Sequence, residues 1–198
     1  DVLLVFTALS HAGTEELIGK MLLFVNCTHE SLSGGHLELV NPDKVVLEIP
    51  PLGHAAMEEV QARLPILAAL RERGFHLAFN HQVLESAYAP WLPLADFIKL
   101  DISLLPPEQL AVLVKYAGRQ SQARLIAEKV ETAQQFDMVS ALGVQLFQGY
   151  LFARPTVVQT RLLSPGQASI VQLLNLLGGR AGTDAIEEVL KKYAGLAF

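Results

Sequence analysis

The chain has 198 residues, of which 51% are hydrophobic and 18% are charged, and its formal net charge is −5. A chain of this length and apolar content buries the core of one domain rather than staying disordered, and its single cysteine, Cys27, excludes an internal disulfide and a cysteine zinc cluster. Because the balance is acidic and no apolar run is long enough to span a bilayer, we expect a cytoplasmic protein that binds neither a nucleic-acid polymer nor a membrane.

The first part of the chain predicts two strands that carry polar side chains. Val2–Leu9 is apolar throughout and is compatible with a strand or a helix. Met21–Asn26 and Val45–Ile49 are short apolar runs, and Asn41-Pro42-Asp43 between them indicates a turn. We therefore predict two strands, the first ending at its asparagine and the second carrying Glu48.

A helix is predicted over Ala56–Arg73, because its apolar residues recur at helical spacing. These residues are Met57, Val60, Leu64, Leu67 and Leu70. Pro65 lies inside the pattern, so we expect it to kink or split the helix, and Gly74 should end it.

Two more strands follow, each with a polar residue at or near its end. Phe75–Phe79 predicts a strand that Asn80 follows, and Phe97–Leu100 predicts a strand that carries Lys99. Prolines indicate a loop between these strands. A helix is expected over Pro107–Val114, because proline suits the first turn of a helix.

The stretch from residue 123 to residue 155 predicts a strand, a helix and a strand. Arg124–Glu128 and Val144–Phe147 are apolar runs. The helix between them should begin at a capping box formed by Thr132 and Gln135 and should end at Gly143. Two parallel strands joined by a crossover helix form a βαβ unit.

Together the runs predict an α/β fold in which six strands alternate with helices, and their even spacing favours a barrel over an open sheet. In such folds the carboxyl ends of the strands meet at one mouth, where sites are usually built. The polar residues expected at this mouth are Asn26, Glu48, Asn80, Lys99, Glu128, Glu131 and Gln148. Taken alone, the pattern favours Glu48, Lys99, Asp101 and Glu128 as a charge-balanced polar cluster at a barrel mouth, without a catalytic role.

Two blocks of sequence, AEKVET and FQGYLFARP, resemble the closing signature of EAL domains, the phosphodiesterases that linearise cyclic di-GMP. The corresponding family blocks read AEGVET and QGYLFSRP, with a helix-length gap between them. The resemblance covers roughly Asp1–Arg161 and is nearest to the subfamily in which an EAL-like barrel precedes an HDOD domain.

This resemblance implies a TIM-like (β/α) barrel over residues 1–161, with a helix at Val2–Leu9. The barrel is incomplete at its N-terminus, because two strands, including the one that carries the Glu-Ala-Leu tripeptide, have no counterpart in this sequence. Residues 162–198 resemble the start of the all-helical HDOD domain. Helices near Gln167–Leu177 and Ala185–Tyr193 should bury four apolar side chains against the barrel or against another chain, namely Leu173, Leu177, Ile186 and Leu190.

The resemblance also implies metal ligands. Asn26 and Glu48 match a metal-binding asparagine and glutamate of the family. Asn80 and His81 stand where the family has two metal-binding aspartates, so a carboxamide and an imidazole replace two carboxylates. Hard cations such as Mg²⁺ need oxygen ligands and negative charge. We therefore expect no bound cofactor, or Mg²⁺ or Mn²⁺ if the site is active.

The remaining site residues are implied in the same way. Lys99 matches the lysine that orients the attacking water, and Glu128 matches a base or organiser of the metal site. Glu131 and Gln148 match residues that support the site loop and the ligand. Without a metal, Lys99 should pair with Glu48, Glu128 or Asp101, since a buried charge needs a partner.

Three hypotheses follow. The leading one is a catalytically degenerate EAL-like signalling module that binds a protein, a second copy of itself or cyclic di-GMP. The first alternative is an active metal-dependent cyclic di-GMP phosphodiesterase. The third is a barrel enzyme of unrelated chemistry that uses Lys99 and Glu128.

Overall fold

The computed structural model describes residues 21–53, 57–153 and 182–192, together with positions 170, 173 and 176. The chain divides into two compact units, Leu47–Val157 and a second one made of Asp1–Val46 and Val158–Phe198. The helix predicted at Val2–Leu9 and most of the one predicted at Gln167–Leu177 lie outside the described residues. The division into a barrel over residues 1–161 and an extension over 162–198 stays a prediction.

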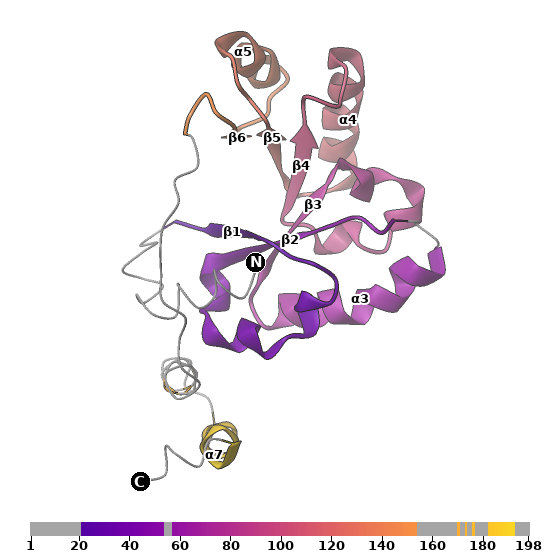
Figure 1. Ribbon diagram of the computed structural model, residues 1–198. Helices are drawn as coiled ribbons and strands as arrows, with labels where there is room; N and C mark the ends of the chain where they lie inside the picture. Colours follow the sequence, from indigo (N-terminus) through magenta and orange to yellow (C-terminus); the bar gives the residue numbers. More distant parts are fainter. Residues whose placement is uncertain are drawn as a thin grey trace. The chain divides into compact units, whose positions relative to one another are not determined.

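Six strands form one sheet in the order β1-β2-β3-β4-β5-β6. Figure 1 labels these strands on the ribbon. The strands are β1 (Leu23–Asn26), β2 (Val45–Ile49), β3 (His76–Asn80), β4 (Phe97–Asp101), β5 (Arg124–Glu128) and β6 (Leu146–Gln148). The registered pairs from β3 to β6 are all parallel. The predicted α/β class and the incomplete (β/α) arrangement of parallel strands are confirmed.

Three α-helices lie in connections between strands, namely α3 (Met57–Glu72), α4 (Pro107–Gln120) and α5 (Ala133–Ala141). Helix α7 (Thr183–Lys192) follows the last strand. The connection from β3 to β4 instead contains the short 3-10 helices η4 (His81–Leu84), η5 (Ser86–Tyr88) and η6 (Leu92–Leu94). Three further 3-10 helices precede β2, namely η1 (Ser31–Ser33), η2 (Gly35–Leu39) and η3 (Pro42–Lys44).

The middle strands β2, β3 and β4 are buried on both faces over most of their length, as parallel sheets covered by helices require. In β4 the first four residues are all buried, and in β2 Val45, Val46 and Leu47 have no exposed surface. Ile98 is also fully buried. Each such side chain contributes about 1.5–3 kcal/mol relative to an exposed one.

Helix α3 runs unbroken across Pro65, so the helix is not split there. Proline removes one backbone hydrogen bond and frees the carbonyl of Gln61. Both residues are exposed, so water can satisfy that carbonyl. Val60, Leu67 and Leu70 are buried on the other side of the helix and hold it in place, while the predicted core residue Met57 is exposed.

Several predicted boundaries shift, those of α4 and β6 among them. Helix α4 continues six residues past Val114, because the buried Ala117 extends its apolar face beyond Leu110. Strand β6 begins at Leu146 rather than at Val144. The N–H of Val144 donates to the carbonyl of Val139 and so still belongs to the closure of α5.

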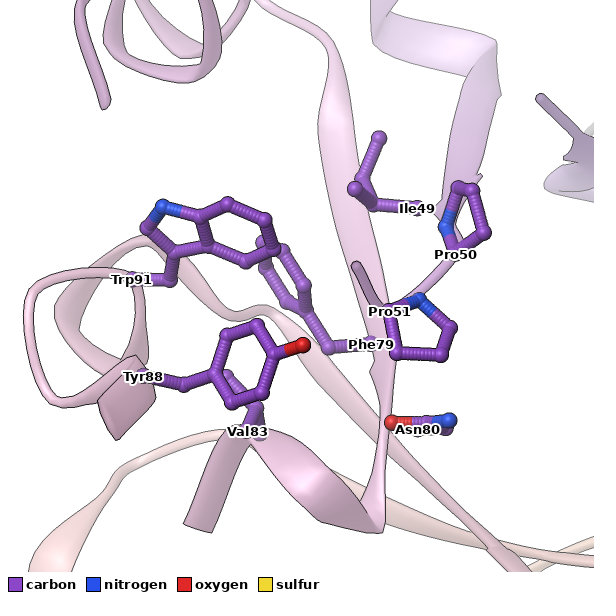
Figure 2. A pocket seen from close by; sticks show the side chains of 8 residues that line it. All are labelled: Ile49, Pro50, Pro51, Phe79, Asn80, Val83, Tyr88 and Trp91. Carbon is purple, nitrogen blue, oxygen red and sulfur yellow. The ribbon is translucent and has the colours of Figure 1, made fainter. Parts of the chain in front are cut away.

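An aromatic cluster fixes the connection from β3 to β4 (Figure 2). The ring of Trp91 lies 5.1 Å from that of Tyr88 and 5.8 Å from that of Phe79, measured between centroids. The Trp91 Nε1–H donates to the carbonyl of Val60 in α3 at 2.8 Å. The Tyr88 hydroxyl accepts from the N–H of Leu52 at 2.9 Å. Trp91 is therefore a packing residue and has no free face for a ligand.

In α7, Ile186 and Leu190 are half-buried and Val189 is buried. Leu173 is half-buried as well, whereas Leu177 lies outside the described residues. Of the four side chains predicted to be buried in the extension, the three that the structure describes are half-buried. What covers these side chains stays a prediction.

Candidate functional site

Strand register brings predicted site residues together at the carboxyl ends of β4, β5 and β6. Asp101 is the parallel partner of Glu128, and Glu128 is the partner of Gln148. Lys99 lies two residues before the end of β4, so its side chain is on the same face of the sheet as that of Asp101. The polar ends of three strands thus form one continuous edge.

Lys99 is the one charged residue classed as buried in the part of the chain that the structure describes, with 5% of its surface exposed. Its Nζ donates to a carboxylate oxygen of Glu48 and lies 2.7 Å from Oε1 of Glu128. An unpaired ammonium at this depth is strongly unfavourable, so the two carboxylates are what makes its burial possible. Lys99 thus contacts two of the three carboxylates expected from the sequence.

The third carboxylate, that of Asp101, pairs with Lys129, which lies 2.6 Å away between Nζ and Oδ2. Its Oδ1 accepts from the N–H of Ser103 at 3.0 Å and from the Ser103 hydroxyl at 2.6 Å. Partial burial raises the pKa of Asp101, but the hydrogen bonds from Lys129 and Ser103 outweigh it, and the net pKa is lowered. The residue that sequence reasoning missed is Lys129. The signal available was its position in AEKVET, where the family block has glycine.

Glu128, Lys129, Glu131 and Gln148 line an open hollow of about 580 Å³. Gly149, Tyr150 and Ala153 complete its lining. Tyr150 is 58% exposed, so its ring is available to a ligand. This hollow unites three of the predicted site residues, and its volume falls within the usual range of small-molecule sites.

Local backbone chemistry shapes this hollow. The Gln135 side chain accepts from the N–H groups of Glu131 and Thr132, and the Thr132 hydroxyl accepts from the Gln135 N–H. The predicted capping box is therefore present at the start of α5. A Cβ at position 149 would lie 2.1 Å from the carbonyl oxygen of Val130, so only glycine fits there.

The end of β3 is built differently. The Asn80 Oδ1 accepts from the Gln82 N–H at 3.1 Å, and its Nδ2 donates to the Gln82 Oε1 at 3.0 Å, so this side chain caps η4. Asn80 also lines a small cavity of about 10 Å³, together with Pro51 and Trp91 (Figure 2). The carboxamide is thereby engaged within its own turn.

His81 lines a second hollow, of about 470 Å³, with residues of α4 and Leu105. Asn26 ends β1, is exposed and belongs to the other compact unit, so its predicted role as a metal ligand stays a prediction. Within the described residues no group of three or more His, Cys, Asp or Glu side chains is arranged to hold a metal ion. The roles assigned to the other site residues also stay predictions.

The fold is that of an incomplete (β/α) barrel, with polar side chains at the carboxyl ends of its strands. The family model described as EAL domain matches residues 15–155 of this chain. The chain therefore belongs to the EAL domain family. The described residues contain no helix that is long and apolar enough to cross a membrane.

Two curated relatives are cyclic di-GMP phosphodiesterases. CdgJ of Vibrio cholerae is 31% identical over 168 residues, which cover 81% of this chain and 37% of CdgJ. NbdA of Pseudomonas aeruginosa is 33% identical over 156 residues, which cover 69% of this chain and 20% of NbdA. The chain thus spans little more than a third of the length of CdgJ and about a fifth of the length of NbdA.

Solved structures share the fold. The PaMucR phosphodiesterase in complex with cyclic di-GMP is 20% identical with a TM-score of 0.62, covering 78% of this chain and 76% of that one. Klebsiella pneumoniae BlrP1, solved with manganese and cyclic di-GMP, is 27% identical with a TM-score of 0.60, covering 76% of this chain and 43% of that one.

Proposed function

We propose that this chain is a catalytically degenerate EAL module that acts by binding, not by hydrolysis, in bacterial cyclic di-GMP signalling. The observation that carries the proposal is the end of β3. There Asn80 and His81 stand where the family resemblance expects two metal-binding aspartates. The Asn80 carboxamide caps η4, and the His81 side chain lines a hollow against α4.

Charge supports the same conclusion. Asn80 and His81 carry no carboxylate, so the end of β3 adds no negative charge to that of Glu48 and Glu128, which share the ammonium of Lys99. Two divalent cations bring four positive charges and need several carboxylates around them. The side chains present do not fit a pair of metal ions, and we derive no catalytic step through one.

The ligand that this module would bind is cyclic di-GMP. PaMucR and BlrP1 were solved with this nucleotide. In this chain, Glu131 and Gln148 supply hydrogen-bonding groups to the hollow, and the exposed ring of Tyr150 offers a surface on which a base can stack. Binding without turnover would make the chain a receptor for the messenger.

We further propose that the chain comes from an EAL–HDOD protein of the cytoplasm and acts on a protein partner or on a second copy of itself. The support is the sequence of residues 162–198 and the amphipathic helix α7, which presents Val189 on one side and exposed Glu187 and Glu188 on another. A helix of this kind needs a neighbour to cover its apolar side.

A second candidate function is active, Mg²⁺- or Mn²⁺-dependent hydrolysis of cyclic di-GMP. It is favoured by the activity named for CdgJ and NbdA. Lys99 and Glu128 would then orient and activate the attacking water, as the resemblance implies.

Calorimetric titration of cyclic di-GMP into the purified protein, with and without Mn²⁺, tests the proposal. We expect saturable binding whose affinity does not depend on Mn²⁺. Gln148→Ala should weaken binding, whereas Gln120→Ala, at an exposed position at the end of α4, should not. Binding that requires Mn²⁺ and is followed by the heat of hydrolysis would favour the phosphodiesterase.

A further inference from the structure

Helix α4 carries an apolar stripe that the fold leaves exposed. Val112 is 67% exposed, and Tyr116, one turn further along the helix, is 44% exposed. Leu104, which precedes the helix, is 69% exposed. Leu110 and Ala117 are buried and anchor the other side of the helix, so the stripe faces away from the sheet. Exposed apolar side chains that adjoin one another indicate an interaction surface, whereas scattered ones do not.

The stripe adjoins the 470 Å³ hollow beside η4. The hollow has an apolar wall and a polar rim, which consist of Leu105, Val112, Leu113, His81, Glu108 and Gln109. A hollow of this size accepts an aromatic side chain, and aromatic anchors seated in such pockets carry much of the binding energy of protein interfaces. The surface therefore offers a seat for an apolar or aromatic side chain of a partner.

The position of α4 in the fold leaves the stripe open to a partner. The helix connects β4 to β5, and each of these strands has a registered neighbour on both sides. The stripe therefore does not lie beside an end strand, and a strand added at either end of the sheet would leave it uncovered.

The charges of α4 fit a second copy of the same helix. Glu108 lies in the first turn, and Arg119 lies in the last turn, one turn after Lys115. All three are exposed, and among the described residues none of them takes part in an ion pair. Three helical turns separate Glu108 from Arg119, so both lie on the same side of the helix, with Val112 between them. In two antiparallel copies of α4, the acidic end of each therefore meets the basic end of the other.

We propose that the exposed stripe of α4 is a self-association surface, on which a second copy of this chain binds antiparallel about a twofold axis near Val112. Each copy then places its Tyr116 over the hollow of the other. A second copy is one of the partners that the proposed function names, and the inference rests on it. A twofold contact uses the same patch on both copies and closes at a dimer. One helix on each side makes a small interface, so we expect micromolar association and monomers in the dilute samples used for unfolding.

Sedimentation equilibrium of the full chain over a concentration series tests the charge arrangement. Glu108→Lys and Arg119→Glu, each alone, should raise the dissociation constant of the dimer at least about tenfold, because like charges then meet on both sides of the axis. An equimolar mixture of the two variants should associate within about threefold of the native chain, since both contacts then join opposite charges again. Glu58→Lys, at an exposed position in the first turn of α3, is the matched control and should behave as the native chain.

The apolar stripe is tested in the same way. Val112→Asp should also raise the dissociation constant at least about tenfold, because two carboxylates then meet at the axis, whereas Met57→Asp, at a 51% exposed position of α3, should leave it unchanged. A native chain that stays monomeric throughout the series would overturn the inference. So would a dimer that Val112→Asp leaves intact, or a mixture of charge variants that does not restore association. These measurements need neither nucleotide nor Mn²⁺, so their failure is distinct from failure of the proposed binding of cyclic di-GMP.

Discussion

The side chains at the ends of β3 and β5 differ in the range of the contacts that they make. At the end of β5, Glu128 joins Lys99 of β4, which in turn joins Glu48 of β2, so charges far apart in sequence hold three strands together. At the end of β3, Asn80 bonds only to Gln82, two residues away, in the contacts described for its side chain. The first arrangement ties strands to one another, while the second closes a local turn. Substitutions should therefore be costly at the first and mild at the second.

The largest expected effect is that of Lys99→Met, which leaves Glu48 and Glu128 beside each other without a countercharge. Breaking a buried ion pair by removing one partner costs about 3–5 kcal/mol. Urea unfolding should show this loss, whereas Lys115→Met, an exposed position on α4, should change stability by less than about 0.5 kcal/mol. Equal stability of the two variants would mean that the three charges do not hold the strand ends.

Much of this arrangement could be predicted from sequence, because it follows from periodicity. Apolar runs located all six strands, and their alternation with helices placed Glu128 and Gln148 at one edge. The same reasoning anticipated the carboxylate partners of Lys99, since a buried ammonium has few alternatives.

What sequence reasoning missed depends on geometry that composition does not encode. Lysine is not expected in the left-handed region, so the ion pair of Lys129 with Asp101 was not foreseen. Pro65 in α3 was expected to disturb the helix, yet solvent exposure lets the helix continue. The placement of His81 against α4 follows from the turn that Asn80 caps, which the strand pattern alone does not specify.

The substitution Gly149→Ala tests how tightly the backbone is packed just after β6. The new methyl group would overlap the Val130 backbone, which is hydrogen-bonded on both sides and cannot withdraw easily. We expect a loss of about 1–3 kcal/mol in thermal unfolding, as for overpacked cores. Gly118→Ala is the matched control, since a Cβ there meets nothing within 4 Å inside α4, and alanine should stabilise that helix by about 0.5–1 kcal/mol. Destabilisation by both variants to the same degree would contradict the account.

A smaller effect should appear as a pH dependence. The pKa of Asp101 lies below its ordinary value of 3.8, so its pairing stabilises the fold fully above that pH and is lost as the pH falls through the lowered pKa. The pKa of Lys129 lies above 10.5, so the same pairing is lost as the pH rises through the raised value.

The difference in unfolding midpoint between the native chain and Asp101→Asn should therefore be constant at intermediate pH and should narrow at both extremes. Glu108→Gln, at an exposed position in the first turn of α4, serves as the control. A difference in unfolding midpoint that grows as the pH falls below 3.8 would contradict the lowered pKa of Asp101.

The smallest expected change is at the end of β3. Asn80→Asp with His81→Asp restores the two carboxylates that the family resemblance expects, yet we predict almost no hydrolysis of cyclic di-GMP, because the carboxylates of Glu48 and Glu128 stay paired with Lys99. Strong turnover by the double variant alone, measured by chromatography, would show that the two aspartates suffice.

Hydrolysis of cyclic di-GMP by the unmodified protein in Mg²⁺ or Mn²⁺ is the most direct test of the central claim, that this site binds without catalysing. Chromatography of the linear product over a long incubation, beside Glu128→Ala as the matched variant, gives the answer. We predict product at background level for both proteins. Clear turnover by the native chain that Glu128→Ala abolishes would contradict the degenerate reading and establish the phosphodiesterase.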